Sequence, residues 1–182
     1  MSKKPKKNAL PRTLKKRLQE KQRAQKIIDR STSDLVDRVC SSSRLPESKI
    51  LKGFPGLRKM SEIIIEYAEP MLRAARSYID QKKAIGIAIA VWNLSLLPEA
   101  KRRKELRNLK TALMGSDCPA ETAQGFDSIC NFFLNRKADL FPEEDRDVVD
   151  FECVETPRGI HLNVVSGIPM RGLSKNSILS EP

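Results

Sequence analysis

The sequence predicts a mainly helical α+β domain: a small helical bundle around a buried central helix, with a C-terminal β-hairpin and a flexible basic N-terminal arm. Three observations support this prediction. Apolar residues recur at spacings of three and four through the middle of the chain, which is typical of amphipathic helices. Near the C-terminus the spacing changes to two, which favours strands. Nearly all of the net charge of +11 lies close to the N-terminus.

The length of 182 residues suits one domain with tails. We place the domain at residues 31–166, between a basic arm at 1–30 and a disordered tail at 167–182 that is rich in Gly, Pro, Ser and Lys. The arm holds twelve Lys and Arg against two acids, a net charge of +10, which leaves +1 of the total +11 for the rest. We expect disorder at its lysine-rich start and then a helix that is marginal in water, because the apolar face is thin.

The first element expected in the domain is a short helix. Ser31 is followed three residues later by Asp34, as in a capping box, so a helix from about Ser33 to Cys40 is predicted. Leu35 is among its inward residues. Residues 45–56 contain two prolines and two glycines, so they read as a loop with one helical turn near its middle.

The next segment has apolar residues at spacings of three and four from Leu57 to Tyr78, which predicts an amphipathic helix. Pro70 lies inside it. Because proline removes a backbone donor and clashes with the preceding turn, we expect a kink or break near residues 66–69.

Residues 84–97 carry no charge and are too few to span a bilayer, which takes about 20 apolar residues. Alternation of Ile and Val with small residues would suit a buried strand. The length and the alanines favour a helix, which we predict to be the central helix of the bundle. Within it, Trp92 and Asn93 read as a core tryptophan and a buried amide that satisfies a loop backbone.

Two further helices are expected. Pro98 opens the first, which runs from Glu99 to Met114, and Gly115 serves as its C-cap. Its predicted inward residues are Ala100, Leu106, Leu109 and Leu113. Asp117 is expected to cap the second helix, which ends before Phe141. Its predicted apolar stripe is Ala123, Phe126, Ile129, Cys130, Phe133 and Leu134.

Alternating apolar residues flank Thr156-Pro157-Arg158-Gly159, which predicts a β-hairpin. Val149, Phe151 and Cys153 are the expected inward residues of its first strand. An isolated hairpin is only marginally stable, so its apolar face must pack on the helices. Residues 139–155 carry eight acids and one arginine, a net charge of −7. We expect the basic arm to fold back transiently onto this acidic segment.

No pattern of catalytic, metal or cofactor residues stands out, so none is predicted and an enzyme is not expected. Cys40, Cys118, Cys130 and Cys153 lack the paired spacing of a zinc site and read as reduced thiols. His161 falls on the polar side of the hairpin. The carboxylates at 143–150 lack the spacing of a calcium loop.

The basic arm, with a smaller patch at 101–107, predicts a non-enzymatic accessory protein of nucleic acid or ribonucleoprotein. The arm has no aromatic residue, so the contacts expected are to phosphates and do not distinguish DNA from RNA. The candidate nucleic-acid-binding residues are Lys3, Lys4, Lys6, Lys7, Arg12, Lys15, Lys16, Arg17, Lys21, Arg23, Lys101, Arg102, Arg103 and Arg107.

The alternative function is a protein-interaction or regulatory module whose arm only tunes solubility. Attraction of the arm to an anionic membrane is weaker, because its apolar face is thin. The sequence shows neither a signal-peptide core nor a membrane span, so we expect a cytoplasmic protein without membrane association.

Overall fold

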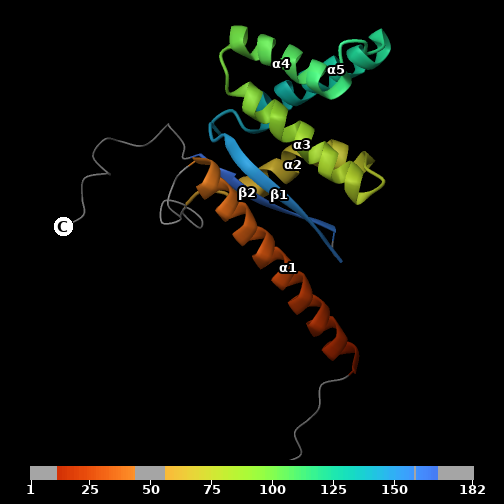
Figure 1. Ribbon diagram of the computed structural model, residues 1–182, viewed down its shortest axis with the longest axis vertical. Helices are drawn as coiled ribbons and strands as arrows, with labels where there is room; N and C mark the ends of the chain where they lie inside the picture. The colour runs from red at the N-terminus through yellow and green to blue at the C-terminus, as the bar shows by residue number, and fades with distance from the viewer. Residues whose placement is uncertain (1–11, 44–55, 158, 168–182) are drawn as a thin grey trace, which may run out of the picture.

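The computed structural model describes residues 12–43, 56–157 and 159–167. They form five helices followed by one antiparallel hairpin (Figure 1). The mainly helical α+β class is therefore confirmed. The elements are α1 (Arg12–Ser43), α2 (Met60–Ala74), α3 (Tyr78–Ser95), α4 (Glu99–Met114), α5 (Ala120–Leu140), β1 (Val148–Thr156) and β2 (Gly159–Ser166).

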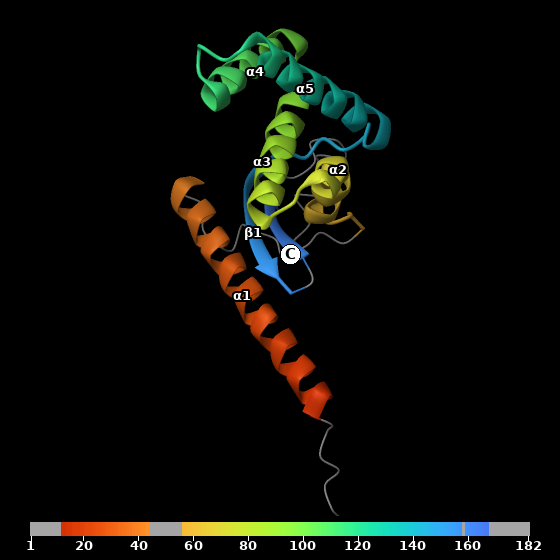
Figure 2. The same ribbon diagram turned by 90° about the vertical axis from the view of Figure 1, so that its right-hand side faces the viewer.

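The uncharged segment is helical and central, as predicted. It forms most of α3, which contacts α2, α4, α5 and both strands, and which lies in the middle of the molecule in both ribbon views (Figures 1 and 2). Ile85 and Trp92 on one side of α3 and Ala88 on another are all inaccessible to solvent. Enclosure on several sides explains why the segment shows no polar face. Without a polar face, the pattern of apolar residues does not distinguish a buried helix from a buried strand.

The predicted helix from Leu57 to Tyr78 is shorter and belongs partly to α3. It continues through residues 66–69 and past Pro70, so of the kink or break predicted there, the break does not occur. The helix ends at Ala74, and Ser77 then caps α3 by accepting a hydrogen bond at Oγ from the Asp80 N–H, 3.1 Å away. Because of this cap, Tyr78 is the first residue of α3 and is not part of α2.

The core joins α2, α3 and α5 through aromatic rings. Tyr67 lies 5.1 Å from Trp92 and 4.9 Å from Phe133 between ring centroids. Its hydroxyl donates to the Phe133 carbonyl at 3.0 Å. Trp92 Nε1 donates to the Arg146 carbonyl at 2.9 Å, which confirms the prediction of a core tryptophan. The polar tips of both rings are thus satisfied inside the core.

Helix α4 is more peripheral than predicted. Gly115 ends it with φ of 79°, as expected of a C-cap glycine. None of its residues is fully buried; Leu106 and Leu109 are half-buried against the core, whereas Ala100 and Leu113 are exposed. The inward assignment of these last two residues is wrong, because α4 contacts its neighbours along a narrow strip.

Helix α5 begins one residue after Pro119, with no side-chain cap, so the cap predicted at Asp117 is wrong. Phe126, Cys130 and Phe133 are buried as predicted. Ile129 is exposed, because it lies at the edge of the predicted stripe, on the side of α5 that faces away from the core.

The hairpin has the predicted turn, with Thr156 opposite Gly159. A bulge interrupts the pairing near its open end: Val148 pairs with Ser166 and Asp150 with Val165. Val149 is the extra residue and is 50% exposed, so the prediction that it points inward is wrong. The bulge restores the alternation by placing Val148 in the core instead.

The two faces of the hairpin are covered by different helices. Cys153 and Leu162 belong to the core formed with α2, α3 and α5. The opposite face lies against α1, whose Leu35 is buried. Helix α1 is continuous through residues 31–33, so the separate short helix predicted from Ser33 to Cys40 is part of α1 instead, and Thr32 Oγ1 donates to the Ile28 carbonyl at 2.9 Å. The residues predicted to cap a helix thus lie inside α1.

Candidate nucleic-acid interface

The N-terminal half of α1 extends away from the rest of the molecule (Figures 1 and 2). Every residue from 13 to 23 is exposed, and full burial begins only at Leu35. Charged side chains in this half are therefore presented to solvent on a helix anchored at its other end.

The charges of α1 are divided between two sides of the helix. With 100° per residue, Ile28, Leu35 and Val39 share the side that faces the hairpin, where the helix is buried or half-buried. A set of basic residues projects from the opposite side, and we call this set the outer basic face. It consists of Lys15, Lys16, Arg23, Lys26 and Arg30, all exposed.

The structure thus brings together three of the predicted residues, Lys15, Lys16 and Arg23. It adds Lys26 and Arg30, which the sequence prediction missed. Lys16, Arg23, Lys26 and Arg30 are separated by seven, three and four residues, a spacing that places basic residues on one side of a helix just as it does apolar ones.

Other predicted residues of the arm do not belong to this face. By the same helical spacing, Arg17 and Lys21 project from the side of α1 that carries Ile28 and Leu35, but in the exposed N-terminal half of the helix. Lys3, Lys4, Lys6 and Lys7 lie outside the described residues, as does the side chain of Arg12, the first residue of α1.

The second predicted patch lies on α4, at the opposite end of the molecule from the start of α1 (Figures 1 and 2). Lys101, Arg103 and Arg107 are exposed, and Arg103 forms an ion pair with Glu99. Arg102 is half-buried and its guanidinium lies 3.5 Å from the Ser95 carbonyl. The two groups of predicted residues therefore do not form one surface.

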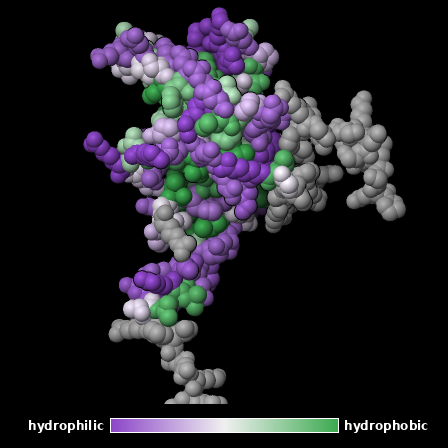
Figure 3. Space-filling model, turned by 180° about the vertical axis from the view of Figure 1, so that it is seen from behind, coloured by the Kyte–Doolittle hydropathy of each residue, from purple (hydrophilic) through white to green (hydrophobic). Residues whose placement is uncertain are grey.

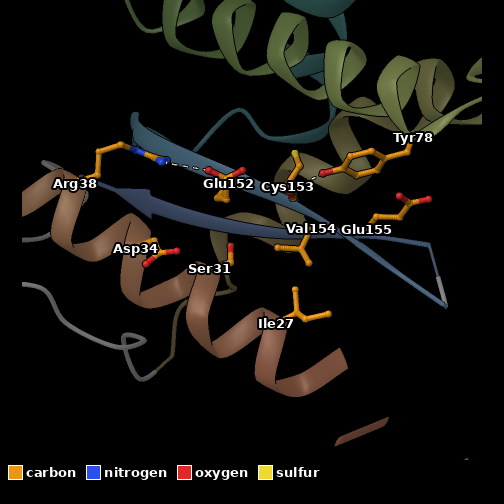
Figure 4. A pocket seen from close by; sticks show the side chains of 9 residues that line it. All are labelled: Ile27, Ser31, Asp34, Arg38, Tyr78, Glu152, Cys153, Val154 and Glu155. Atoms are coloured by element: carbon orange, nitrogen blue, oxygen red, sulfur yellow. Dashed lines mark hydrogen bonds and ion pairs between the residues drawn. The ribbon is translucent and has the colours of Figure 1, made fainter. Parts of the chain in front are cut away.

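On its inner side α1 borders an acidic groove. The groove has a volume of about 390 Å³ and is lined by Ile27, Ser31, Asp34, Arg38, Tyr78, Glu152, Cys153, Val154 and Glu155 (Figure 4). The carboxylates of Asp34, Glu152 and Glu155 outnumber the single arginine, so this side of α1 does not suit a phosphate. The inner side of α1 therefore differs in charge from the outer basic face.

Arg38 fastens α1 to the acidic strand β1. Its guanidinium contacts Asp150 at 2.6 Å and Glu152 at 3.2 Å. The hydrogen bond with Asp150 raises the pKa of Arg38 above its ordinary value. The acidic segment is thus partly neutralised by α1 itself, through a residue beyond the predicted arm. The predicted transient contact of the arm, residues 1–30, with this segment stays a prediction, since residues 1–11 lie outside the described residues.

The thiol that lines the groove is not activated as a nucleophile. Burial raises the pKa of the Cys153 thiol to about 11, so it is protonated at neutral pH. The Tyr78 hydroxyl donates to the Cys153 carbonyl at 2.6 Å. His161 is half-buried and bonds Asn163 at 3.1 Å. Within the described ranges, no group of three His, Cys, Asp or Glu side chains is arranged to hold a metal ion.

Seen from behind, most of the surface is hydrophilic, with apolar side chains gathered between the α4–α5 end and α1 (Figure 3).

In the part of the chain that the structure describes, no helix combines the length and apolar character needed to cross a bilayer. Comparison of the chain with protein-family models, curated proteins and solved structures finds no match.

Proposed function

We propose that the chain is a non-enzymatic accessory protein that attaches to nucleic acid or ribonucleoprotein through the outer basic face of α1. The observation that carries this proposal is the distribution of charge along α1: from Lys15 to Arg30 the outer side carries five basic residues, and an acidic groove lies on the inner side. Arg30, the last of the five, also forms an ion pair with Asp34. A face that projects beyond the body can lie along a polyanion without interference from the domain.

The dimensions of α1 fit this role. Residues 12–30 span about 28 Å at 1.5 Å per residue, which matches roughly eight base-pair steps of duplex DNA. Helix α1 contains no aromatic residue, so it offers phosphate contacts rather than base stacking. We therefore propose binding that is independent of sequence and strongly dependent on salt. The patch on α4 is a separate contact at the other end, and Lys3 to Lys7 extend the arm in sequence.

Two variants with equal charge changes test the proposal. The first replaces Lys16, Arg23, Lys26 and Arg30 with Gln, and the control replaces Lys59, Arg73, Arg76 and Lys83, which belong to neither proposed contact, with Gln; all eight residues are exposed. Affinity for duplex DNA and for single-stranded RNA is measured by fluorescence anisotropy over a range of salt concentrations.

If all four replaced residues contact phosphates, the slope of log K against log salt should fall by about 3 to 4 for duplex DNA in the first variant. The control should change it by 1 or less. Equal losses in the two variants would mean that only bulk charge matters, and an unchanged first variant would sink the proposal. The stronger ligand decides between DNA and RNA.

A protein-interaction module is the second candidate function. It is favoured by Ile129 and Phe132, which lie on the same side of α5 and are 39% and 47% exposed. Recovery of one protein partner from a nuclease-treated extract, lost in Phe132→Ser, would support it over the first. A cytoplasmic location belongs to both proposals and is checked by fractionation of cells that express the tagged chain.

A further inference from the structure

The outer edge of β1 is closed by side chains. Phe151 O accepts a hydrogen bond from the Arg38 guanidinium at 3.1 Å, and Cys153 O accepts one from the Tyr78 hydroxyl at 2.6 Å. Asn93 bonds both backbone groups of Val148. A further strand therefore cannot pair with β1 without displacing these three side chains.

The same bonds define which backbone groups of β2 point away from β1. Phe151 pairs with Val164 and Cys153 with Leu162. Because the carbonyls of Phe151 and Cys153 point outward, both pairs are of the type that exchanges no backbone hydrogen bonds. The N–H and C=O groups of Leu162, Val164 and, by alternation, Ile160 therefore point to the outer edge of β2. Among the described residues, no hydrogen bond reaches these groups.

Strand β2 lacks the features that usually protect an edge strand, namely charge, proline or a bulge. Its sequence from Gly159 to Ser166 contains no Asp, Glu, Lys, Arg or Pro. Strand β1, in contrast, carries three acids and the bulge at Val149. Among the residues that the structure describes, the hairpin is therefore protected on the β1 edge only, and its β2 edge is uncharged.

We propose that β2 pairs with β2 of a second copy of this chain, in antiparallel orientation about a two-fold axis. The product is a continuous four-stranded sheet in the order β1-β2-β2-β1. An antiparallel pairing of β2 with itself about a two-fold axis is self-complementary, since the outward N–H groups of each copy meet the outward C=O groups of the other. It also brings no like charges opposite each other, because the strand is uncharged. It satisfies the outward groups of Ile160, Leu162 and Val164 in both copies.

The direction of α1 is compatible with this dimer. Helix α1 runs alongside the hairpin (Figure 1), so a two-fold axis through β2 makes the two α1 helices antiparallel. Their basic halves then project from opposite ends of the sheet, which keeps the two regions of highest positive charge apart. This inference does not depend on what the outer basic face binds.

Hydrogen exchange on the full chain tests the proposal without any substitution. The sample is kept in high salt after nuclease treatment, so that nucleic acid cannot bridge two copies. Amides of Ile160, Leu162 and Val164 should become protected as the protein concentration rises from micromolar to millimolar. Amides of His161, Asn163 and Val165, which face β1, should be protected throughout and serve as internal controls. The mass by light scattering should rise in parallel, from 20.6 kDa to twice that value.

Two proline variants test the edge directly. Val164→Pro removes an outward N–H and should abolish the dimer while keeping the helical circular dichroism. Val165→Pro removes an N–H that bonds β1 and should destabilise the fold itself. A monomer at every concentration would overturn the proposal. Protection of the outward amides in the dilute monomer would also overturn it, since the chain's own residues would then cover the edge. A dimer that persists in a folded Val164→Pro variant would do the same.

Discussion

The side-chain amide of Asn93 bonds both backbone groups of Val148, accepting from its N–H and donating to its carbonyl at 2.8 Å each. An amide in this position replaces the neighbouring strand that β1 lacks on its outer edge. The adjacent Trp92 bonds the Arg146 carbonyl. Two consecutive residues of α3 thus hold the start of β1, and through it the whole hairpin, against the central helix.

Replacement of Asn93 by Leu should lower the free energy of unfolding by about 2–4 kcal/mol. The volume is nearly unchanged, but both polar groups of Val148 lose their partner, and an unmade buried hydrogen bond costs about 1–3 kcal/mol. Urea denaturation measures the loss. Asn131→Leu on the exposed side of α5 is the matched control and should change stability by less than about 0.5 kcal/mol. Equal effects of the two substitutions would contradict the role assigned to the amide.

The sequence allowed the prediction that the side-chain amide of Asn93 bonds a backbone group, but not which residue carries that group. A polar residue inside an uncharged helix has few options other than a backbone group, whereas Val148 lies 55 residues away in sequence and is located by tertiary packing alone. The central helix and the hairpin turn were predictable for a similar reason, because composition and turn residues act locally.

Predictions failed where a neighbour decides the outcome. Leu113 has the spacing of a core residue, yet α4 contacts the bundle too narrowly to bury it. Val149 fits the alternation, but the bulge at Val148 shifts it outward. The outer basic face was only partly predicted, because its full extent depends on which side of α1 the hairpin covers. The capping signal at Ser31 was overridden by the continuous helix, whose following turns are held by Leu35, Val36 and Val39.

The ion pair between Glu144 and Arg146 makes the free energy of unfolding depend on pH. Burial by itself would raise the pKa of Glu144, but hydrogen bonds from the side chain and backbone of Arg146 outweigh it, so the pKa lies below the ordinary 4.5. A depressed folded-state pKa contributes stability above the unfolded pKa, and this contribution is lost as the pH falls through the folded pKa.

Glu144→Gln should therefore destabilise the protein by roughly 1–3 kcal/mol at neutral pH, and the difference from the parent should shrink below pH 4.5. Melting temperatures of both proteins between neutral and acidic pH provide the measurement. The exposed Glu121→Gln serves as the control and should follow the parent at every pH. A constant difference for Glu144→Gln across the whole range would show that the carboxylate's charge is not responsible.

The four cysteines should react at very different rates. Cys130 and Cys153 are buried, and burial raises the pKa of each thiol to about 11, so roughly one molecule in a thousand is a thiolate at pH 8. Cys40 and Cys118 are only half-buried. Iodoacetamide at pH 8 should therefore label the latter two first, with the other two labelled only after urea is added. Mass spectrometry of the peptides follows each site, and rapid native labelling of Cys153 would contradict its burial.

The two halves of α1 should differ in stability although they form one helix. Leu35 is 2% exposed, whereas Leu18 is 48% exposed on the projecting half. Leu35→Ala should cost about 2–4 kcal/mol because it opens a cavity beside the hairpin. Leu18→Ala, the same substitution on the same helix, should cost less than about 0.5 kcal/mol.

Amide hydrogen exchange should show the same gradient in the unmodified chain, fast from residues 14 to 24 and slow from 33 to 40. The reason is that a helix without tertiary contacts opens locally, independently of the global fold. A saturating polyanion should slow exchange in the projecting half only, because neutralised basic side chains no longer repel one another across its turns. Uniform exchange along α1 would mean that the projecting half is held by contacts other than those of the helix itself. If exchange slowed only at residues 33–40, the polyanion would not be bound to the outer basic face.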